Sequence, residues 1–115
     1  MTICRWAEVP DEKLNERVSR QVLHTASMTM ARITLLKGAI VPVHHHVSEQ
    51  ILTLNSGRLV CRMAGEEIVL GPGETLEIPP NLPHSVEALE DSIALDVFAP
   101  RREDWIRGDD AYLRR

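Results

Sequence analysis

The chain has 115 residues, 43% of them hydrophobic and 26% charged, and a formal net charge of −4. This length supports one hydrophobic core, and this composition excludes extensive disorder. The acidic balance, without any basic run, argues against a nucleic-acid partner. No apolar N-terminal segment and no long apolar run occur, so we expect neither a signal peptide nor a membrane span. Cys4 and Cys61 are isolated from each other, which favours two reduced thiols in a cytoplasmic protein.

We expect residues 1–115 to form one domain with three parts. Residues 1–17 are polar and predict an N-terminal arm, residues 18–100 predict a β-barrel, and residues 101–115 predict a C-terminal helical tail. In the middle part, short aliphatic or β-branched runs alternate with glycine or proline breaks, a spacing typical of all-β sandwiches and barrels. The nine strands predicted from these runs are Val18–His24, Met28–Leu36, Ile40–His46, Gln50–Asn55, Arg58–Met63, Glu67–Leu70, Glu74–Ile78, His84–Ala88 and Ser92–Phe98.

The last of these strands, Ser92–Phe98, carries apolar residues on both faces. Alternation along a strand places Ala94, Asp96 and Phe98 on one face. Ile93, Leu95 and Val97 then lie on the other face. We expect one face to line the barrel interior and the other to meet a second copy of the chain, which predicts a homodimer.

The tail begins after Pro100. Arg101–Arg107 predict a helical turn or two, with Gly108 as the C-cap. Trp6 and Trp105 lie near the two chain ends, and we expect them to pack the termini.

The most informative stretch lies between residues 38 and 57. His44 and His46 are two residues apart, so on a strand their imidazoles share one face and His45 points away. Gln50 offers an amide oxygen after a short turn, and His84 adds a third imidazole after the proline-rich segment 79–83. Three imidazoles and one amide oxygen would suit a divalent transition metal. The alternative interpretation of the histidine run is a surface cluster.

The spacing of these residues is specific. The chain reads Gly38-x5-His44-x-His46-x3-Gln50-x6-Gly57 and then Gly73-x5-Pro79-x4-His84. These two segments resemble the two signature motifs of the cupin superfamily, which implies a double-stranded β-helix, a jelly-roll barrel, and disfavours the surface cluster. Three positions depart from the motifs: Gln50 replaces a glutamate, Asn81 an inner glycine and Ala88 an asparagine.

The glutamine changes the chemistry of the predicted metal site. A neutral amide leaves the ion with one fewer negative charge around it, so the ion stays more Lewis-acidic. Mn, Fe, Co, Ni and Zn all remain open. Glu49 is a rival ligand, but strand alternation points it away from Gln50, and we favour Gln50.

A finer resemblance lies in His44–Gln50, in Leu95–Trp105 and in the closing Gly108–Leu113. These segments are similar to the small single-domain cupins of the pectin-degradation type, called KdgF. The resemblance implies linearisation of 4,5-unsaturated monouronates, the sugar acids released by pectate and alginate lyases, to open-chain keto uronates. It also implies a metal inside the barrel and a dimer. The family's Asp-x-Phe-x3-Arg active-site arrangement falls on Asp96, Phe98 and Arg102.

These three residues make chemical sense beside a metal. A carboxylate such as Asp96 can move protons near a dication, Phe98 can form a wall against a sugar ring, and Arg102 can hold a uronate carboxylate in a bidentate fork. Each also has a structural interpretation. Asp96 would then be a satisfied carboxylate, Phe98 part of the core, and Arg102 a surface partner of Glu103 or Asp104.

Two other functions fit the same residues. A non-catalytic cupin would use the metal only to dock a sugar or metabolite. An Fe-dependent dioxygenase would use three histidines and a fourth oxygen ligand for O₂ chemistry. Only one Tyr, one Phe and two Trp are present, which favours a small polar substrate over a large aromatic one.

Overall fold

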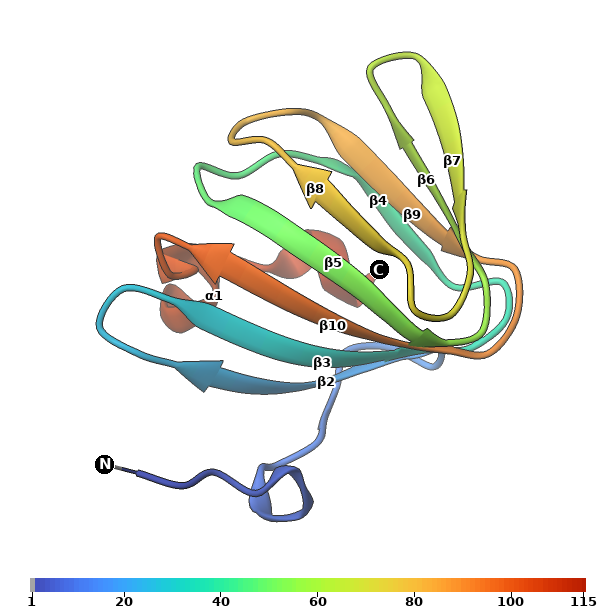
Figure 1. Ribbon diagram of the computed structural model, residues 1–115. Coiled ribbons are helices and arrows are strands. Elements are labelled where there is room, and N and C mark those ends of the chain that lie inside the picture. Colours follow the sequence, from blue (N-terminus) through green and yellow to red (C-terminus); the bar gives the residue numbers. More distant parts are fainter. Residues whose placement is uncertain (1) are drawn as a thin grey trace.

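The structure, a computed structural model, describes residues 2–115, so Met1 of the predicted arm lies outside the described residues. Two antiparallel sheets face each other across the core (Figure 1). The larger sheet has, in spatial order, β1 (Glu12–Lys13), β2 (Val18–His24), β3 (Thr29–Leu35), β10 (Ser92–Ala99), β5 (Glu49–Ser56) and β8 (Thr75–Ile78). The smaller sheet has β4 (Ile40–His44), β9 (His84–Ala88), β6 (Leu59–Met63) and β7 (Glu66–Leu70). The helical elements are a 3-10 turn at Trp6–Glu8, α1 (Glu103–Arg107) and a 3-10 turn at Ala111–Arg114.

The predicted all-β barrel with a short C-terminal helical turn is confirmed. All nine predicted strands are present, and their ends differ from the prediction by at most two residues. The sequence did not predict β1, which pairs Glu12 with Arg20 and Lys13 with Ser19. Both β1 residues are exposed and charged, so no apolar alternation marks them as a strand.

The core lies between the two sheets and is built by strand alternation. Leu52 and Leu54 of β5 and Leu59 of β6 are almost fully buried. Along β10, every second side chain is buried and the residues between them are half-buried. The buried set includes Ala94, Asp96 and Phe98. This strand pairs with β3 on one side and β5 on the other, so it runs through the centre of the larger sheet.

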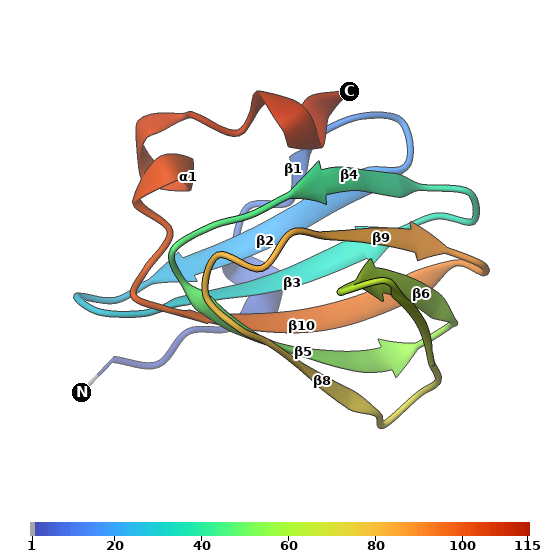
Figure 2. The same ribbon diagram turned by 90° about the horizontal axis from the view of Figure 1, so that it is seen from above.

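The C-terminal tail covers one end of the barrel, on the side where β4 ends (Figure 2). As predicted, Gly108 ends α1 in the left-handed conformation, with φ 80°, and its N–H caps the helix. Trp105 is buried, and the Arg20 guanidinium carbon lies 4.5 Å from the centre of its ring. Arg20 also pairs with buried Asp110 of the tail.

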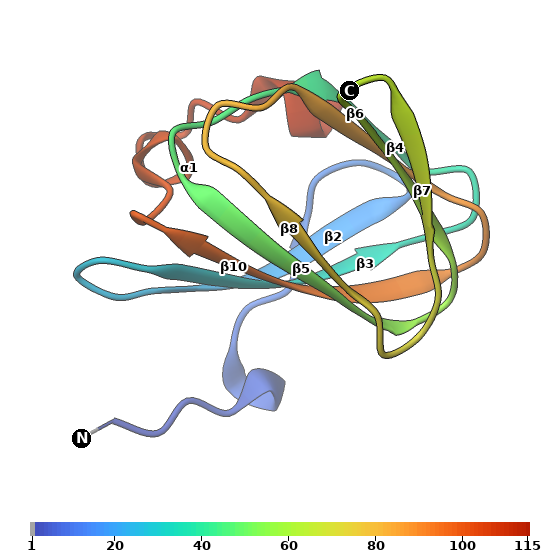
Figure 3. The same ribbon diagram turned by 45° about the horizontal axis from the view of Figure 1, so that its top comes forward.

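The chain ends are held to each other and to the sheet. Asn15 donates hydrogen bonds to the carbonyls of Leu113 and Arg115, at 3.1 and 3.2 Å. The segment around Trp6 lies outside the larger sheet (Figure 3). The Trp6 carbonyl accepts a 2.6 Å hydrogen bond from the Gln21 side chain of β2. Cys4 and Cys61 form no disulfide. Within residues 2–115, no helix has the length and apolar character needed to cross a bilayer.

Gly57, which follows β5 and closes the first sequence motif, generates a stability prediction. Its φ is +92°, and a Cβ there would lie 2.7 Å from Ser92 Cα and still closer to Ser92 Oγ and the Asp91 carbonyl. Gly65 has a similar φ of +76° but nothing within 4 Å. We expect Gly65→Ala to cost about 1 kcal/mol from backbone strain, and Gly57→Ala to cost about 3 kcal/mol or more because backbone must move. Urea unfolding of both variants measures the difference, and equal losses would contradict the packing argument.

Candidate metal centre

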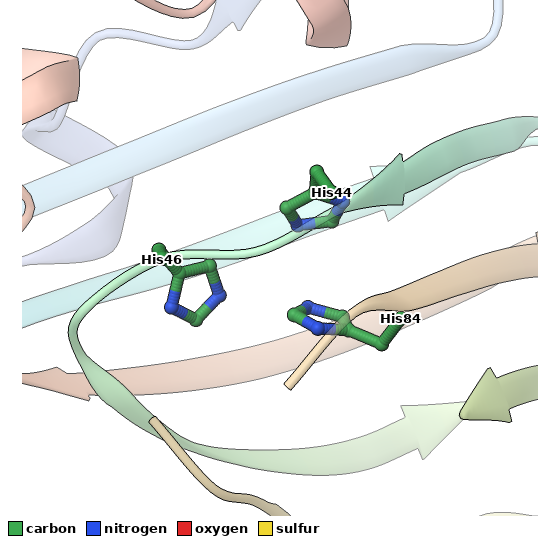
Figure 4. Close-up of side chains that lie close together, drawn as sticks. All are labelled: His44, His46 and His84. Atoms are coloured by element: carbon green, nitrogen blue, oxygen red, sulfur yellow. The ribbon is translucent and has the colours of Figure 1, made fainter. Parts of the chain in front are cut away.

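Three histidines converge at the tail-covered end of the barrel (Figure 4). His44 is the last residue of β4 and His84 the first of β9, and the two are directly paired across the antiparallel ladder. His46 follows in the loop after β4, and not on the strand as the sequence predicted. The loop nevertheless turns its imidazole toward the other two. One nitrogen from each ring lies within 4.8 Å of the others.

Backbone carbonyls fix the proton position on each ring. Every Nδ1 lies 2.8 Å from a carbonyl oxygen two residues away; the pairs are His44 with Pro42, His46 with Ser48 and His84 with Leu82. A carbonyl only accepts hydrogen bonds, so each Nδ1 carries the proton. Each Nε2 therefore presents a lone pair, as a metal-binding histidine does when its other nitrogen donates to a backbone carbonyl.

Burial keeps these rings neutral. It lowers the pKa of His44 and of His46 from the usual value of 6.5 to about 4. Burial also lowers the pKa of His84. A neutral imidazole is the form that binds a metal, so at neutral pH these rings need not release a proton first.

Gln50 completes the cluster from β5. Its Oε1 lies 3.1 Å from His46 Nε2, while its amide nitrogen donates a 3.1 Å hydrogen bond to Asp96 Oδ1. The amide orientation is thereby set, and Oε1 faces a nitrogen that carries no proton in the neutral ring. Two lone-pair atoms in contact, with no hydrogen between them, are what a shared cation would stabilise.

The donor set fits a divalent transition metal. Three imidazole nitrogens and one amide oxygen suit Mn, Fe, Co, Ni or Zn and do not suit Ca or Mg, which prefer oxygen ligands. The set does not select among these metals. The rival ligand Glu49 is exposed on the other face of β5, and His45 is exposed as well. Neither side chain belongs to the cluster.

Asp96 and Phe98 lie on the inner face of β10, beside the cluster. Asp96 is buried, and burial raises the pKa of its carboxyl from 3.8 to about 7, although the hydrogen bond from Gln50 and the charge of Arg102 oppose the shift. Such a group exchanges its proton readily at neutral pH. The Phe98 ring meets the His46 ring edge-on, with centroids 5.5 Å apart. Phe98 thus packs against the candidate metal site as well as in the core.

Arg102 is buried. The alternative interpretation from the sequence, which placed it on the surface, is wrong in this respect. It pairs with Asp104: its Nε and Nη2 donate to the two carboxylate oxygens at 3.0 and 2.8 Å. Its guanidinium carbon lies 4.8 Å from the centre of the Phe98 ring and 4.4 Å from that of Trp105. Asp104 therefore takes one of the edges with which Arg102 could hold a substrate carboxylate, the Nε–Nη2 edge.

A cavity of about 50 Å³ lies between the sheets, and its lining includes His44, Gln50, Asp96 and Arg102. That volume holds a few water molecules. Tyr112 of the tail also lines this cavity, and the sequence analysis gave it no role. The available signals were that Tyr112 is the only tyrosine of the chain and that it lies in the closing segment Gly108–Leu113.

The comparisons with known proteins agree with this geometry. Residues 31–98 match the family described as the cupin domain. KdgF from Halomonas sp. is 27% identical, with 91% of this chain and 98% of that chain covered and a TM-score of 0.85. An RmlC-like cupin from Shewanella frigidimarina is 25% identical, with 91% and 96% covered and a TM-score of 0.85.

A predicted oxalate decarboxylase from Thermotoga maritima shares the fold at 20% identity, with 86% of this chain and 99% of that chain covered and a TM-score of 0.76. No curated protein matches the sequence.

His46 and its sequence neighbour provide a matched test of the metal site. We expect His46→Ala to lose stoichiometric metal, because the ring supplies an inward-facing lone pair next to Gln50 Oε1. His45→Ala removes an exposed imidazole and should keep its metal. Elemental analysis of both purified variants measures the difference. Full metal content in His46→Ala would refute the assignment of His46 as a ligand.

Proposed function

This chain belongs to the cupin domain family, and we propose that it is a metal-dependent cupin that linearises 4,5-unsaturated monouronates to open-chain keto uronates. One observation carries the proposal. Asp96, Phe98 and Arg102, which match the Asp-x-Phe-x3-Arg arrangement, line the same cavity as His44 and Gln50. The likeness to KdgF from Halomonas sp. over nearly the full length of both chains supports it.

His44, His46, His84 and Gln50 would hold the ion. A divalent metal bound there would supply Lewis-acid polarisation of a substrate oxygen. The uncharged Gln50 adds no anion to the site, and the three imidazoles are neutral. The protein's own charge therefore does little to reduce the positive charge of the ion.

Asp96 would move the proton. The reaction is an isomerisation in which the C1–O5 ring bond breaks, the C1 hydroxyl loses its proton as C1 becomes an aldehyde, O5 gains a proton, and the resulting C5 enol becomes a ketone. The last change adds a proton at C4 and removes the enol proton from O5. A buried carboxyl whose pKa is about 7 holds a proton in part of the population at neutral pH and accepts one in the rest. Gln50 orients this carboxyl through its amide nitrogen.

Phe98 and Arg102 would shape the sugar-acid site. The Phe98 ring presents an apolar wall next to His46. Arg102 brings a cation into a cavity with few other charges, and Asp104, Phe98 and Trp105 hold its guanidinium in place. A fixed cation favours an anionic sugar over a neutral one.

We also propose that two copies associate through the outer face of the larger sheet, and that the protein works in the cytoplasm. Strand register places Leu23, Met30, Val97 and Ile51 in one outward-facing row across four strands. A row of this kind is apolar surface that a second copy would cover. The two free thiols fit a reducing compartment.

The function is tested by the loss of ultraviolet absorbance of a 4,5-unsaturated monouronate. We expect metal-loaded protein to accelerate this loss over spontaneous ring opening, and protein stripped with EDTA to show only the spontaneous rate. Asp96→Asn should lower kcat by about 10²- to 10⁴-fold with its metal content unchanged. Glu49→Gln makes the same carboxylate-to-amide change at an exposed position and should leave kcat unchanged.

Either of two results would contradict the proposal. No acceleration by metal-loaded wild type would favour a binding role or another substrate. Full activity of Asp96→Asn would exclude Asp96 as the proton-moving group.

The dimer is tested by light scattering at micromolar concentration. We expect a dimer mass for the wild type and a monomer mass for Ile51→Glu, because the variant places a charge in the apolar row. Val69→Glu is the matched control, since Val69 has nearly the same exposure (47% against 46%) but lies on the smaller sheet. A monomeric wild type would rule the dimer out.

A further inference from the structure

Tyr112 joins the C-terminal tail to the metal cluster. Its ring stacks on that of His44, with centroids 4.7 Å apart and an interplanar angle of 27°. Its hydroxyl oxygen accepts a 2.7 Å hydrogen bond from Arg102 Nη2. The residue lies outside the matched segment 31–98 and outside both histidine motifs. Its position depends on how the C-terminal tail packs against the barrel.

Two hydrogen-bond donors at this position have no acceptor. The Tyr112 oxygen receives hydrogen bonds from Arg102 and, at 3.5 Å, from Trp105 Nε1, but among residues 2–115 nothing accepts the phenolic proton. Arg102 Nη1 likewise donates to no group in the described chain, because Asp104 and Tyr112 use only its Nε and Nη2. Both residues line the inner cavity. Donors left unmatched beside a cavity favour a ligand that brings acceptor oxygens.

The charge and the free donors at Arg102 and Tyr112 favour an anionic ligand. Arg102 is 2% exposed and always charged, and Asp104 occupies its Nε–Nη2 edge but leaves the Nη1 hydrogens without an acceptor in the described chain. Hydrogen bonds to a carboxylate are about twice as strong as those to a neutral oxygen such as a phenol. A carboxylate would therefore replace the Tyr112 oxygen as the acceptor for Nη2 and would accept the phenolic proton as well.

We propose that Tyr112 and Arg102 together form the carboxylate receptor of the site, with Tyr112 as a specificity-determining residue for sugar acids over neutral sugars. This inference rests on the proposed function, because it places the carboxylate of that substrate. The carboxylate inserts between the phenolic O–H and the Nη1–Nη2 edge, so that both residues donate to it. Tyr112 is half-buried whereas Arg102 and Phe98 are each 2% exposed, so Tyr112 is the one of these three side chains that can move outward to admit the sugar.

The single tyrosine makes a direct test possible in the wild type. Labelling the tyrosine ζ carbon gives one NMR signal, which reports on the hydrogen bonding of this hydroxyl. With zinc-loaded protein, we expect galacturonate to shift the signal and galactose, which differs in carrying a neutral CH₂OH group, to leave it in place. Galacturonate that binds by calorimetry without shifting the signal would overturn the inference. This measurement needs no variant and no turnover.

Kinetics of Tyr112→Phe give the second test. The variant keeps the ring stacked on His44 and removes only the hydroxyl, so metal content should match the wild type and Tm should fall by a few degrees at most, because Arg102 loses one hydrogen bond. We expect KM for the unsaturated monouronate to rise about tenfold or more, the effect of one lost hydrogen bond to a charged group, and kcat to change by less than about threefold. Arg107→Gln removes an exposed cation of the same tail, which the structure pairs with Asp109, and should leave both constants unchanged.

The outcomes separate this inference from the proposed function. If the wild type is active and Tyr112→Phe has an unchanged KM, the inference is overturned and the proposed function stands. A lower KM in the variant has the same consequence, because Tyr112 would then obstruct the substrate and not bind it. A wild type that neither binds galacturonate nor accelerates ring opening would overturn both.

Discussion

Three imidazoles held neutral, with their Nδ1 protons fixed by backbone carbonyls, are the constraint on which the site depends. The three acceptors are carbonyls of β4 and of the loops next to the other two histidines, each two residues from its own histidine, so the fold sets each tautomer locally. The result is a set of lone pairs facing each other without protons between them. Such a set repels itself slightly when empty, and a cation relieves that repulsion, so metal binding and the stability of this end of the barrel are coupled. The orientation of Gln50 is fixed in a similar way. Its amide nitrogen donates to Asp96, so its oxygen faces His46.

Strand β10 connects this site to the rest of the molecule. Its inner face carries Asp96 and Phe98, while its outer face contributes Val97 to the apolar row that includes Ile51. Because successive residues of a strand point to opposite faces, the chemical group and the apolar surface are fixed by one register. A one-residue slip of β10 against β3 or β5 would remove Asp96 from Gln50 and expose the interior positions. The proton-bearing group is therefore placed by a strand that is paired along its length on both sides within the larger sheet.

The sequence predicted the strands and the histidine cluster because both depend on local patterns. Alternation and turn residues mark the strands, and fixed spacing relates His44 to Gln50 along the chain. It misplaced His46 on a strand, since spacing does not reveal where β4 ends. It offered Asp104 as a partner of Arg102 but placed the pair on the surface, and it could not predict that Arg102 is buried or that Tyr112 lies on His44. These contacts depend on where the tail docks, and that docking is set by partners far away in sequence, such as Arg20 with Asp110 and Asn15 with Leu113.

The buried pair of Arg20 and Asp110 shows why the tail is held as it is. Both side chains are almost fully buried, and Arg20 Nη1 has no hydrogen-bond partner within the described chain. Desolvation offsets much of the attraction in such a pair, so an apolar contact of equal size would stabilise the fold about as well. The ion pair also fixes the orientation of the side chains, because it holds Arg20 against the Trp105 ring. Arg102 packs against the same ring. The interaction that docks the tail is thus connected, through one indole, to the cation that we place in the sugar-acid site. The pair therefore matters more for the position of Arg102 and Tyr112 than for the free energy of folding.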